Sequence, residues 1–183
     1  MVEPNSQAKK IVSVVLTALL LILVGMVSGC AKKAEETIKI GAIYPLTGSL
    51  ATTGADVKNG VLLALDIINN EYNLNLPLAR SKGIDSLNGN KVEIVFGDSQ
   101  GSPSAGRSEA ERLISEERVV ALIGCYQSAV TAEASPVAED KEIPFLTAMS
   151  AVTSLTEQGL NWLFRTTPND ETLPFFICRL IKR

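Results

Sequence analysis

The sequence predicts an open α/β fold in which a mostly parallel sheet is doubly wound, with helices on both of its faces. Segments typical of strands and segments typical of amphipathic helices alternate along residues 38–165, and this order implies parallel strands joined by right-handed crossovers. One strand segment, Val119–Gly124, is an uninterrupted apolar run, as expected for a central parallel strand covered on both faces. Hydrophobic residues make up 46% of the chain, which allows a packed core and argues against disorder.

Residues 1–29 have the layout of a secretory signal. Lys9 and Lys10 form a positive start, and Ile11–Gly29 then runs without a charge and finishes in small residues. The segment Val27–Cys30 resembles the bacterial lipobox, in which an aliphatic residue and two small residues precede a cysteine that receives diacylglycerol before cleavage. The sequence therefore predicts a lipoprotein signal peptide over residues 1–29 and lipid attachment at Cys30.

An uncleaved membrane helix is the alternative interpretation of the same segment. Ile11–Gly29 is just long enough to span the roughly 30 Å of hydrocarbon in a bilayer. Under both interpretations the rest of the chain lies outside the cytoplasm and is held at a membrane. Residues 30–37 are expected to form a polar tether between the membrane and the folded part.

The first strand and the first helix of the folded part follow this tether. Ile38–Tyr44 is a strand because its apolar residues alternate, and Pro45–Gly48 ends it as a turn. Residues 54–72 are predicted to be helical. Their apolar stripe has spacings of three and four and consists of Val57, Val61, Leu65, Ile68 and Tyr72.

A loop then leads to the second strand and helix. Residues 73–90 are rich in Asn, Pro, Gly and Ser, which is typical of a loop. Lys91–Phe96 alternates as a second strand. Ser102 followed by Pro103 predicts the N-cap and first residue of a helix that runs to about Glu117.

The remaining elements repeat the strand and helix alternation. After the apolar strand at 119–124 we expect a helix over 128–140 and strands over 143–147 and 160–165. The folded lobe is thus predicted over residues 38–171. Residues 172–183 form a divergent tail.

Composition and charge exclude several classes of function. The net charge is −3, and the basic residues are interspersed with acidic ones, so there is no basic stripe for nucleic acid. The chain contains no histidine, which removes Ser-His-Asp and Cys-His pairs and most zinc sites. Neither a Gly-rich phosphate loop nor a nucleophile elbow is present, so no metal or cofactor is expected. Asp98 has no partner acid in the sequence, and a capping role is favoured over a general base.

The loops that follow the strands are where a ligand is expected. In open α/β sheets, ligands bind beyond the carboxyl ends of the strands, and there this chain has residues 45–54, 124–131 and 147–151, which carry many hydroxyl groups. Ser128 begins the helix over 128–140, so its hydroxyl and nearby N–H groups could face an anion such as a carboxylate. The alternative is that Ser128 merely caps the helix. Ser150 and Thr53 carry the same two interpretations, as ligand contacts or as ordinary turn residues.

Several segments together resemble type I periplasmic solute-binding proteins, specifically the leucine/isoleucine/valine-binding family of ABC importers. The resemblance covers about Ile38 to Glu171. Its pieces follow in order: Ile38–Gly48, Gly54 and Gly60, Ile68-Asn69, Gly97-Asp98, Pro103, Leu113-Ile114, Val120–Gly124, Ser128, Ile143-Pro144, Leu155-Thr156 and Phe164–Thr167. The resemblance implies two α/β lobes joined by a hinge that close on a ligand.

Individual site residues follow from that resemblance. Ser128 matches the serine that holds the ligand's α-carboxylate, and Tyr126 and Gln127 line the same loop. Thr53 matches a position that touches the ligand's side chain, and Met149 matches one whose backbone contacts the ligand. Ala151 stands where many members carry a Thr or Ser that also grips the carboxylate, a hydroxyl that Ser150 could supply instead.

The chain also departs from the family in length and in cysteines. The second lobe, which usually supplies the group that neutralises the ligand's ammonium, has no counterpart in the sequence. The cysteine positions of some members fall on Gly101 and Gln127. Pairing between Cys125 and Cys178 is not expected, because Cys125 follows a buried strand and Cys178 lies in the tail.

The resemblance implies a solute-binding lipoprotein that delivers an amino acid or amide, branched-chain ones first, to an ABC permease. The truncated lobe is expected to bind its ligand weakly or not at all. One alternative is the ligand-binding ectodomain of a membrane-anchored receptor or sensor of the same fold. The other is an enzyme on a flavodoxin-like sheet, which the missing histidines and phosphate loops argue against.

Overall fold

The computed structural model describes residues 37–181 and confirms the predicted open, parallel α/β sheet. The sheet has five parallel strands in the order β2-β1-β3-β4-β5. They are β1 (Ile38–Tyr44), β2 (Val92–Asp98), β3 (Ala121–Gly124), β4 (Phe145–Thr147) and β5 (Leu163–Arg165). The predicted signal peptide, Cys30 and most of the tether lie outside the described residues.

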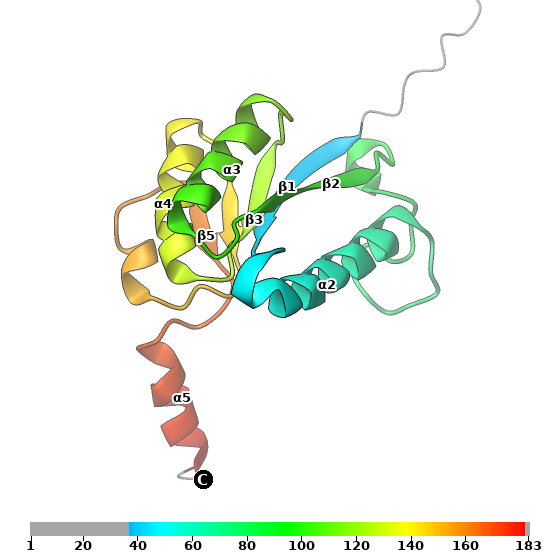
Figure 1. Cartoon of the computed structure of the whole chain (residues 1–183). Helices are drawn as coiled ribbons and strands as arrows, with labels where there is room; N and C mark the ends of the chain where they lie inside the picture. The colour runs from blue at the N-terminus through cyan, green and yellow to red at the C-terminus, as the bar shows by residue number, and fades with distance from the viewer. Residues whose placement is uncertain (1–36, 182–183) are drawn as a thin grey trace, which may run out of the picture. The chain divides into compact units, whose positions relative to one another are not determined.

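The helices cover the two faces of the sheet unequally. They are α2 (Ala51–Asn69), α3 (Pro103–Ser115), α4 (Ser128–Asp140) and α5 (Thr172–Ile181), with short 3₁₀ turns η1 (Gly48–Leu50), η2 (Asp85–Leu87) and η3 (Thr153–Thr156). In Figure 1, α3 and α4 lie on one side of the strands and α2 on the other. None of the helices within residues 37–181 is both long and apolar enough to cross a membrane.

The direction of the crossovers explains why both faces carry helices. The connection from β1 through α2 leads to β2 at one edge, whereas the later connections through α3 and α4 lead to β3 and β4 on the other side of β1. Crossovers between parallel strands of one sheet are nearly always right-handed, so this reversal moves the helices to the opposite face. The reversal point lies between β1 and β3, and there Ile43 pairs with Gly124.

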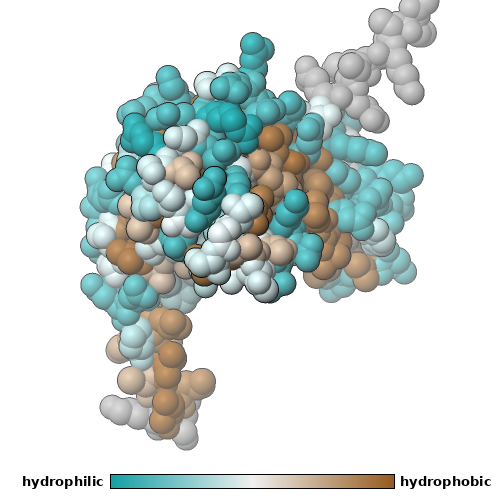
Figure 2. Space-filling view, viewed as in Figure 1, coloured by the Kyte–Doolittle hydropathy of each residue, from teal (hydrophilic) through white to brown (hydrophobic). Residues whose placement is uncertain are grey.

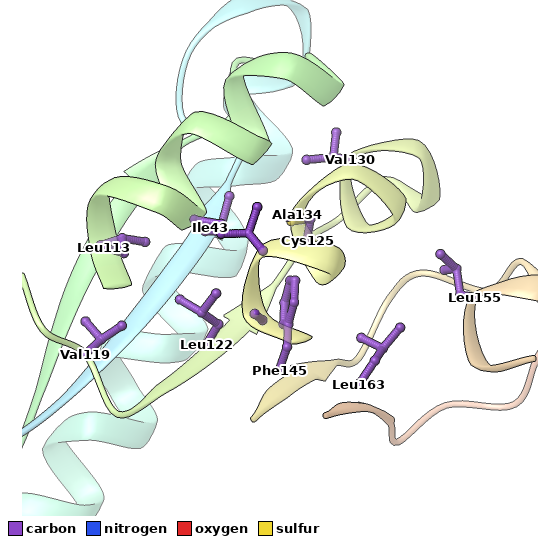
Figure 3. Packing of buried hydrophobic residues seen from close by; sticks show 13 residues of the cluster. Ile43, Leu113, Val119, Leu122, Cys125, Val130, Ala134, Phe145, Leu155 and Leu163 are labelled. Atoms are coloured by element: carbon purple, nitrogen blue, oxygen red, sulfur yellow. The ribbon is translucent and has the colours of Figure 1, made fainter. Parts of the chain in front are cut away.

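The main core lies between the sheet and the face covered by α3 and α4. Figure 3 shows it as side chains from β1, β3, β4 and β5 that meet side chains of those helices. Its largest fully buried members are Phe145, Ile43, Leu113 and Leu122. Cys125, which belongs to this core, and the exposed Cys178 are both free thiols, as the sequence predicts.

The prediction that β3 is covered on both faces is only half right. Leu122 points into the main core and is fully buried, but its neighbour Ile123 on the opposite face is only partly buried. On that face α2 packs against β1 and β2, while Leu146 in β4 and Phe164 in β5 stay 39% and 50% exposed. The continuous apolar run therefore correctly indicates a central strand, but helices cover only one face of that strand fully.

The boundaries of helices and strands shift by a few residues from their predicted positions. Helix α2 begins at Ala51 rather than residue 54 because η1 leads directly into it. Helix α3 has Ser102 as N-cap residue and Pro103 in its first turn, as predicted, although the Ser102 hydroxyl meets Ser104 and makes no capping bond. The tail is helical from Thr172 to Ile181, which the sequence pattern does not predict.

Candidate functional site

The crossovers reverse at the carboxyl ends of β1 and β3, and the three predicted loops leave the sheet at this edge, a group of loops that is called the crevice below. Ligands of open α/β sheets bind at such a point. The loop after β1 runs from Pro45 to Leu50, the loop after β3 contains Cys125 to Gln127, and the loop after β4 contains Met149 to Val152. Parallel register places their starting points on one edge of the sheet.

The first turn of α4 offers N–H groups that have no partner among the described residues. Helix α4 starts at Ser128 with Gln127 as its N-cap residue, and the Gln127 carbonyl accepts the N–H groups of Val130 and Thr131 at 3.1 and 3.0 Å. The N–H groups of Ser128 and Ala129 take part in none of these bonds. Free N–H groups at the positive end of a helix dipole suit an anion.

Ser128 lies at the junction between this helix and the loop after β4. It is the first residue of α4 and not the N-cap residue, which is Gln127, so the simple capping alternative has no support in the geometry. Instead its hydroxyl oxygen accepts the N–H of Val152 at 3.4 Å. The residue is partly buried, and this long contact leaves hydrogen-bonding capacity for a ligand.

Ser150 lies in the interior rather than at the crevice surface. The residue is completely buried, its hydroxyl meets that of Thr131 at 2.6 Å, and it donates to the carbonyl of Cys125 at 3.1 Å. The hydroxyl that was predicted as a substitute for the one missing at Ala151 is therefore already engaged. Ser150 instead ties the loop after β4 to the loop after β3.

The other predicted contacts occupy different parts of the crevice. Thr53 lies in the first turn of α2 and is partly buried, as are Tyr126 and Ala151. Met149 is 43% exposed and lies against α2. Gln127 turns its side-chain oxygen toward Gly101 in the loop after β2, where this buried oxygen has no partner among the described residues. The fold thus brings the predicted residues to one edge without pointing all of them at one spot.

Arg165 and Thr131 position the site, although the sequence alone assigns neither of them a role. The Arg165 guanidinium donates to the carbonyl of Val152 at 2.7 Å and to the Thr156 hydroxyl at 2.6 Å, which fixes the loop after β4. Arg165 belongs to the segment that carries the family resemblance, but no periodic pattern marks it as a loop anchor. Thr131 accepts the N–H of Cys125 at 3.3 Å.

The chemistry of the crevice favours binding over covalent catalysis. Burial raises the pKa of the Cys125 thiol to about 12, and the hydrogen bond with Thr131 only partly opposes this, so a nucleophilic thiolate is not present near neutral pH. Within residues 37–181 no group of three or more metal-ligating side chains is found. The open polar groups are backbone N–H donors and hydroxyls, which recognise an anion.

Asp98 has a structural role, as the sequence favours. Its Oδ1 accepts the N–H groups of Leu46 and Gln100 at 2.8 and 2.9 Å, and its Oδ2 accepts the Thr47 hydroxyl at 2.6 Å. Burial on its own raises the pKa of Asp98, but these hydrogen bonds more than offset it, so its pKa lies below the ordinary value of 3.8. The carboxylate therefore holds the loop after β1 next to β2.

Replacing Asp98 with alanine is expected to destabilise the protein by about 1.5–3 kcal/mol at neutral pH, the usual worth of hydrogen bonds to a charged group. Because the folded pKa is depressed, this contribution is fully present above the unfolded pKa of about 3.9 and is lost as the pH falls through the lower folded pKa. Urea unfolding at several pH values should show the difference between wild type and variant shrink in acid. Glu93→Ala, an exposed change on the same strand, is the control, and an equal or pH-independent loss in both would contradict this role.

Comparisons with known proteins match this chain to solute-binding proteins. Residues 37–177 match the family described as periplasmic binding protein. A Leu/Ile/Val-binding protein homolog 8 from Brucella abortus is 35% identical over 140 residues, which is 76% of this chain and 31% of that protein. The isoleucine complex of the branched-chain amino acid transporter substrate-binding protein LivJ from Streptococcus pneumoniae is 30% identical with a TM-score of 0.62, over 74% of this chain and 35% of that one.

A second solved structure is similar to this chain to the same extent. The leucine-binding protein LivK from Thermotoga maritima is 27% identical with a TM-score of 0.60, over 73% of this chain and 33% of its own. The chain thus spans about a third of the length of the relatives that it matches.

Proposed function

This chain belongs to the periplasmic binding protein family, and on that premise we propose that residues 38–171 form one lobe of an extracytoplasmic solute-binding protein. Its ligand is a free amino acid, branched-chain ones first, which an ABC permease then receives. Similarity to proteins named for leucine, isoleucine and valine supports the ligand class. We further propose that a lipid on Cys30 anchors the protein at the membrane.

The observation that carries this proposal is the first turn of α4. The unpartnered N–H groups of Ser128 and Ala129 and the Ser128 hydroxyl converge at a helix N-terminus. The N–H of Ala151 in the facing loop likewise has no hydrogen-bond partner among the described residues. These donors are matched to the two oxygens of an α-carboxylate.

The remaining residues have supporting roles in this proposal. Thr53 and Tyr126 flank the ligand's side chain, and Met149 provides backbone and an apolar wall. Gln127 supports the loop after β3 through its side chain, which lies next to Gly101. Ser150 acts through Thr131 and Cys125 and keeps the two loops at a fixed separation.

A lobe with donors for the carboxylate alone is expected to bind weakly, at about 1 mM or worse, which corresponds to about −4 kcal/mol. The ligand's ammonium stays unpaired, and its apolar side chain stays half in water. Calorimetry of the chain with isoleucine should detect no micromolar binding. A micromolar dissociation constant would show that this lobe needs no second one.

Ser128→Asp is expected to abolish the weak binding, because it places a carboxylate where the ligand's carboxylate must lie. The measurement is ligand-observed saturation-transfer NMR with isoleucine. Ser154→Asp adds the same charge at an exposed position in η3 and should leave the signal intact. Equal signals from both variants would place the ligand elsewhere and would contradict this role of Ser128.

A further inference from the structure

The loop between α2 and β2 exposes several leucines. Residues 73–90 are called the leucine loop below, and its four leucines are between 43% and 50% exposed: Leu74, Leu76, Leu78 and Leu87. A single exposed leucine is ordinary, whereas several on one short segment indicate an interaction surface. Figure 2 shows hydrophobic side chains that reach the surface between hydrophilic ones on the side of the lobe that carries α2.

The leucine loop is held by hydrogen bonds that bury its alanine and leave its leucines outside. Ala79 is fully buried, its carbonyl accepts the N–H of Tyr72 at 2.6 Å, and its own N–H donates to the carbonyl of Leu76 at 3.3 Å. The Gly83 N–H donates to the carbonyl of Ile68 in α2 at 2.9 Å. Burial of a leucine would remove more apolar area from water than burial of an alanine. The exposure of the leucines is therefore built into the fold of the loop.

The leucine loop lies at the amino ends of β1 and β2, opposite the crevice. Ile38 begins β1 and pairs with Val92, the first residue of β2, and the Ile38 N–H donates to the carbonyl of Lys91 at 2.8 Å. In Figure 1 the loop lies beside the start of β1. The chain from Cys30 therefore enters the lobe next to the leucine loop, and from Cys30 to Ile38 it spans at most about 30 Å.

The charges around the leucines are suited to an anionic surface. Arg80 and Lys82 lie within the loop and Lys91 follows it directly, whereas Asp85 is the one acidic residue of the loop. The three basic side chains are exposed, and none of them forms a salt bridge within the part of the chain that the structure describes. Apolar side chains that enter the headgroup region, together with basic ones attracted to anionic lipids, are typical of surfaces that lie on a membrane.

We propose that the leucine loop is a membrane-contact surface, which binds an anionic bilayer while the lipid on Cys30 anchors the protein. This inference rests on the lipid anchor of the proposed function, because the anchor brings this end of the lobe to the bilayer. The lipid limits only the distance of the lobe from the bilayer, whereas the leucine loop also fixes its orientation, so that the crevice opens away from the membrane. In a two-lobed binding protein the other lobe closes on the ligand at the crevice, at the opposite ends of the strands, and leaves the leucine loop free.

Quenching of a fluorophore on the loop by labelled lipids tests the contact. The full-length lipidated chain with Cys178→Ser and Leu76→Cys is labelled at residue 76, since Cys125 is buried and a lipidated Cys30 has no free thiol. It is reconstituted in vesicles of phosphatidylcholine and phosphatidylglycerol, with and without lipids that carry a nitroxide near the headgroup. We expect the nitroxide lipids to lower the fluorescence at residue 76 to about half or less, because the leucines enter the headgroup region.

The matched control carries the same label at the other end of the strands. Ser154→Cys, an exposed position in η3 after β4, should keep its fluorescence in the same vesicles. Charge reversal by Arg80→Glu with Lys82→Glu should remove most of the quenching at residue 76, because it replaces attraction to anionic lipids with repulsion. Unchanged quenching after this reversal would overturn an anionic bilayer as the partner.

Flotation of the vesicles in a density gradient reports the lipid anchor separately, and Cys30→Ser should abolish it. A chain that floats while residues 76 and 154 are quenched equally would overturn the membrane contact and leave the anchor standing. A chain that does not float would overturn the anchor and the contact together. Protection of residue 76 from both the nitroxide lipids and iodide in the water would show that protein covers the loop, and would overturn the contact as well.

Discussion

Replacing Phe145 with alanine is expected to cost about 3–5 kcal/mol of the free energy of unfolding, a large part of the 5–15 kcal/mol typical of domains. Phe145 is fully buried, and its ring lies in the middle of the main core, between β3, β5 and α4 (Figure 3). The loss combines the apolar area returned to water with the cavity that neighbours cannot close. Urea unfolding followed by the fluorescence of Trp162, the single tryptophan, measures it.

Phe164→Ala is the matched control for this change. Phe164 lies in the neighbouring strand β5, but its side chain points to the open face and is 50% exposed. We expect its replacement to cost at most about 1 kcal/mol, because half of the apolar area is already in water. Similar losses for both phenylalanines would mean that the open face is covered in solution or that the main core is misidentified.

Replacing Gly54 with alanine is expected to destabilise the protein by about 1–3 kcal/mol, the cost of overpacking, and to disrupt ligand binding as well. A Cβ at this position would collide with the backbone carbonyl of Pro45, which cannot move aside as a flexible side chain could. The clash pushes α2 away from the loop after β1. Because Thr53 lies in the same turn of α2, the effect reaches the crevice.

Gly60→Ala, six residues further along the same helix, should stabilise the protein instead of destabilising it. Its added Cβ enters open space, so only the helix propensity changes and we expect a gain of about 0.5–1 kcal/mol. Unfolding of the two variants in parallel, with isoleucine titrations of each, measures both effects. Stabilisation by both substitutions would contradict the close contact between α2 and Pro45.

The sequence predicts the sheet well because the residue types along a strand directly follow its period of two and its burial. All five strands are found where alternation or an apolar run predicts them, although β3 begins at Ala121 rather than Val119. The start of α2 is missed because its first turn, Ala51 to Gly54, is small or polar and shows no apolar period. Helix α5 is missed for another reason. Its large apolar side chains are exposed and face no core within the described chain.

The site is less predictable than the sheet, because hydroxyl direction depends on loop geometry rather than on spacing. The sequence places Ser128 and Ser150 at the same edge, and the strand ends confirm this. Only the folded structure shows that the Ser150 hydroxyl is buried and bonded to Thr131 and to the carbonyl of Cys125, whereas the first turn of α4 keeps free donors. Periodicity and spacing do not tell these two serines apart, and only the family resemblance singles out Ser128.

The central claim is that the first turn of α4 recognises a carboxylate, and amide NMR of the full chain in detergent micelles tests it most directly. Spectra of selectively ¹⁵N-labelled protein are recorded during titration with isoleucine and, separately, with isoleucinamide, which lacks the charged carboxylate. We expect the amide signals of Ser128, Ala129 and Ala151 to shift with isoleucine and to stay in place with the amide. Equal shifts with both compounds, or shifts with isoleucine that avoid these three amides, would contradict the account.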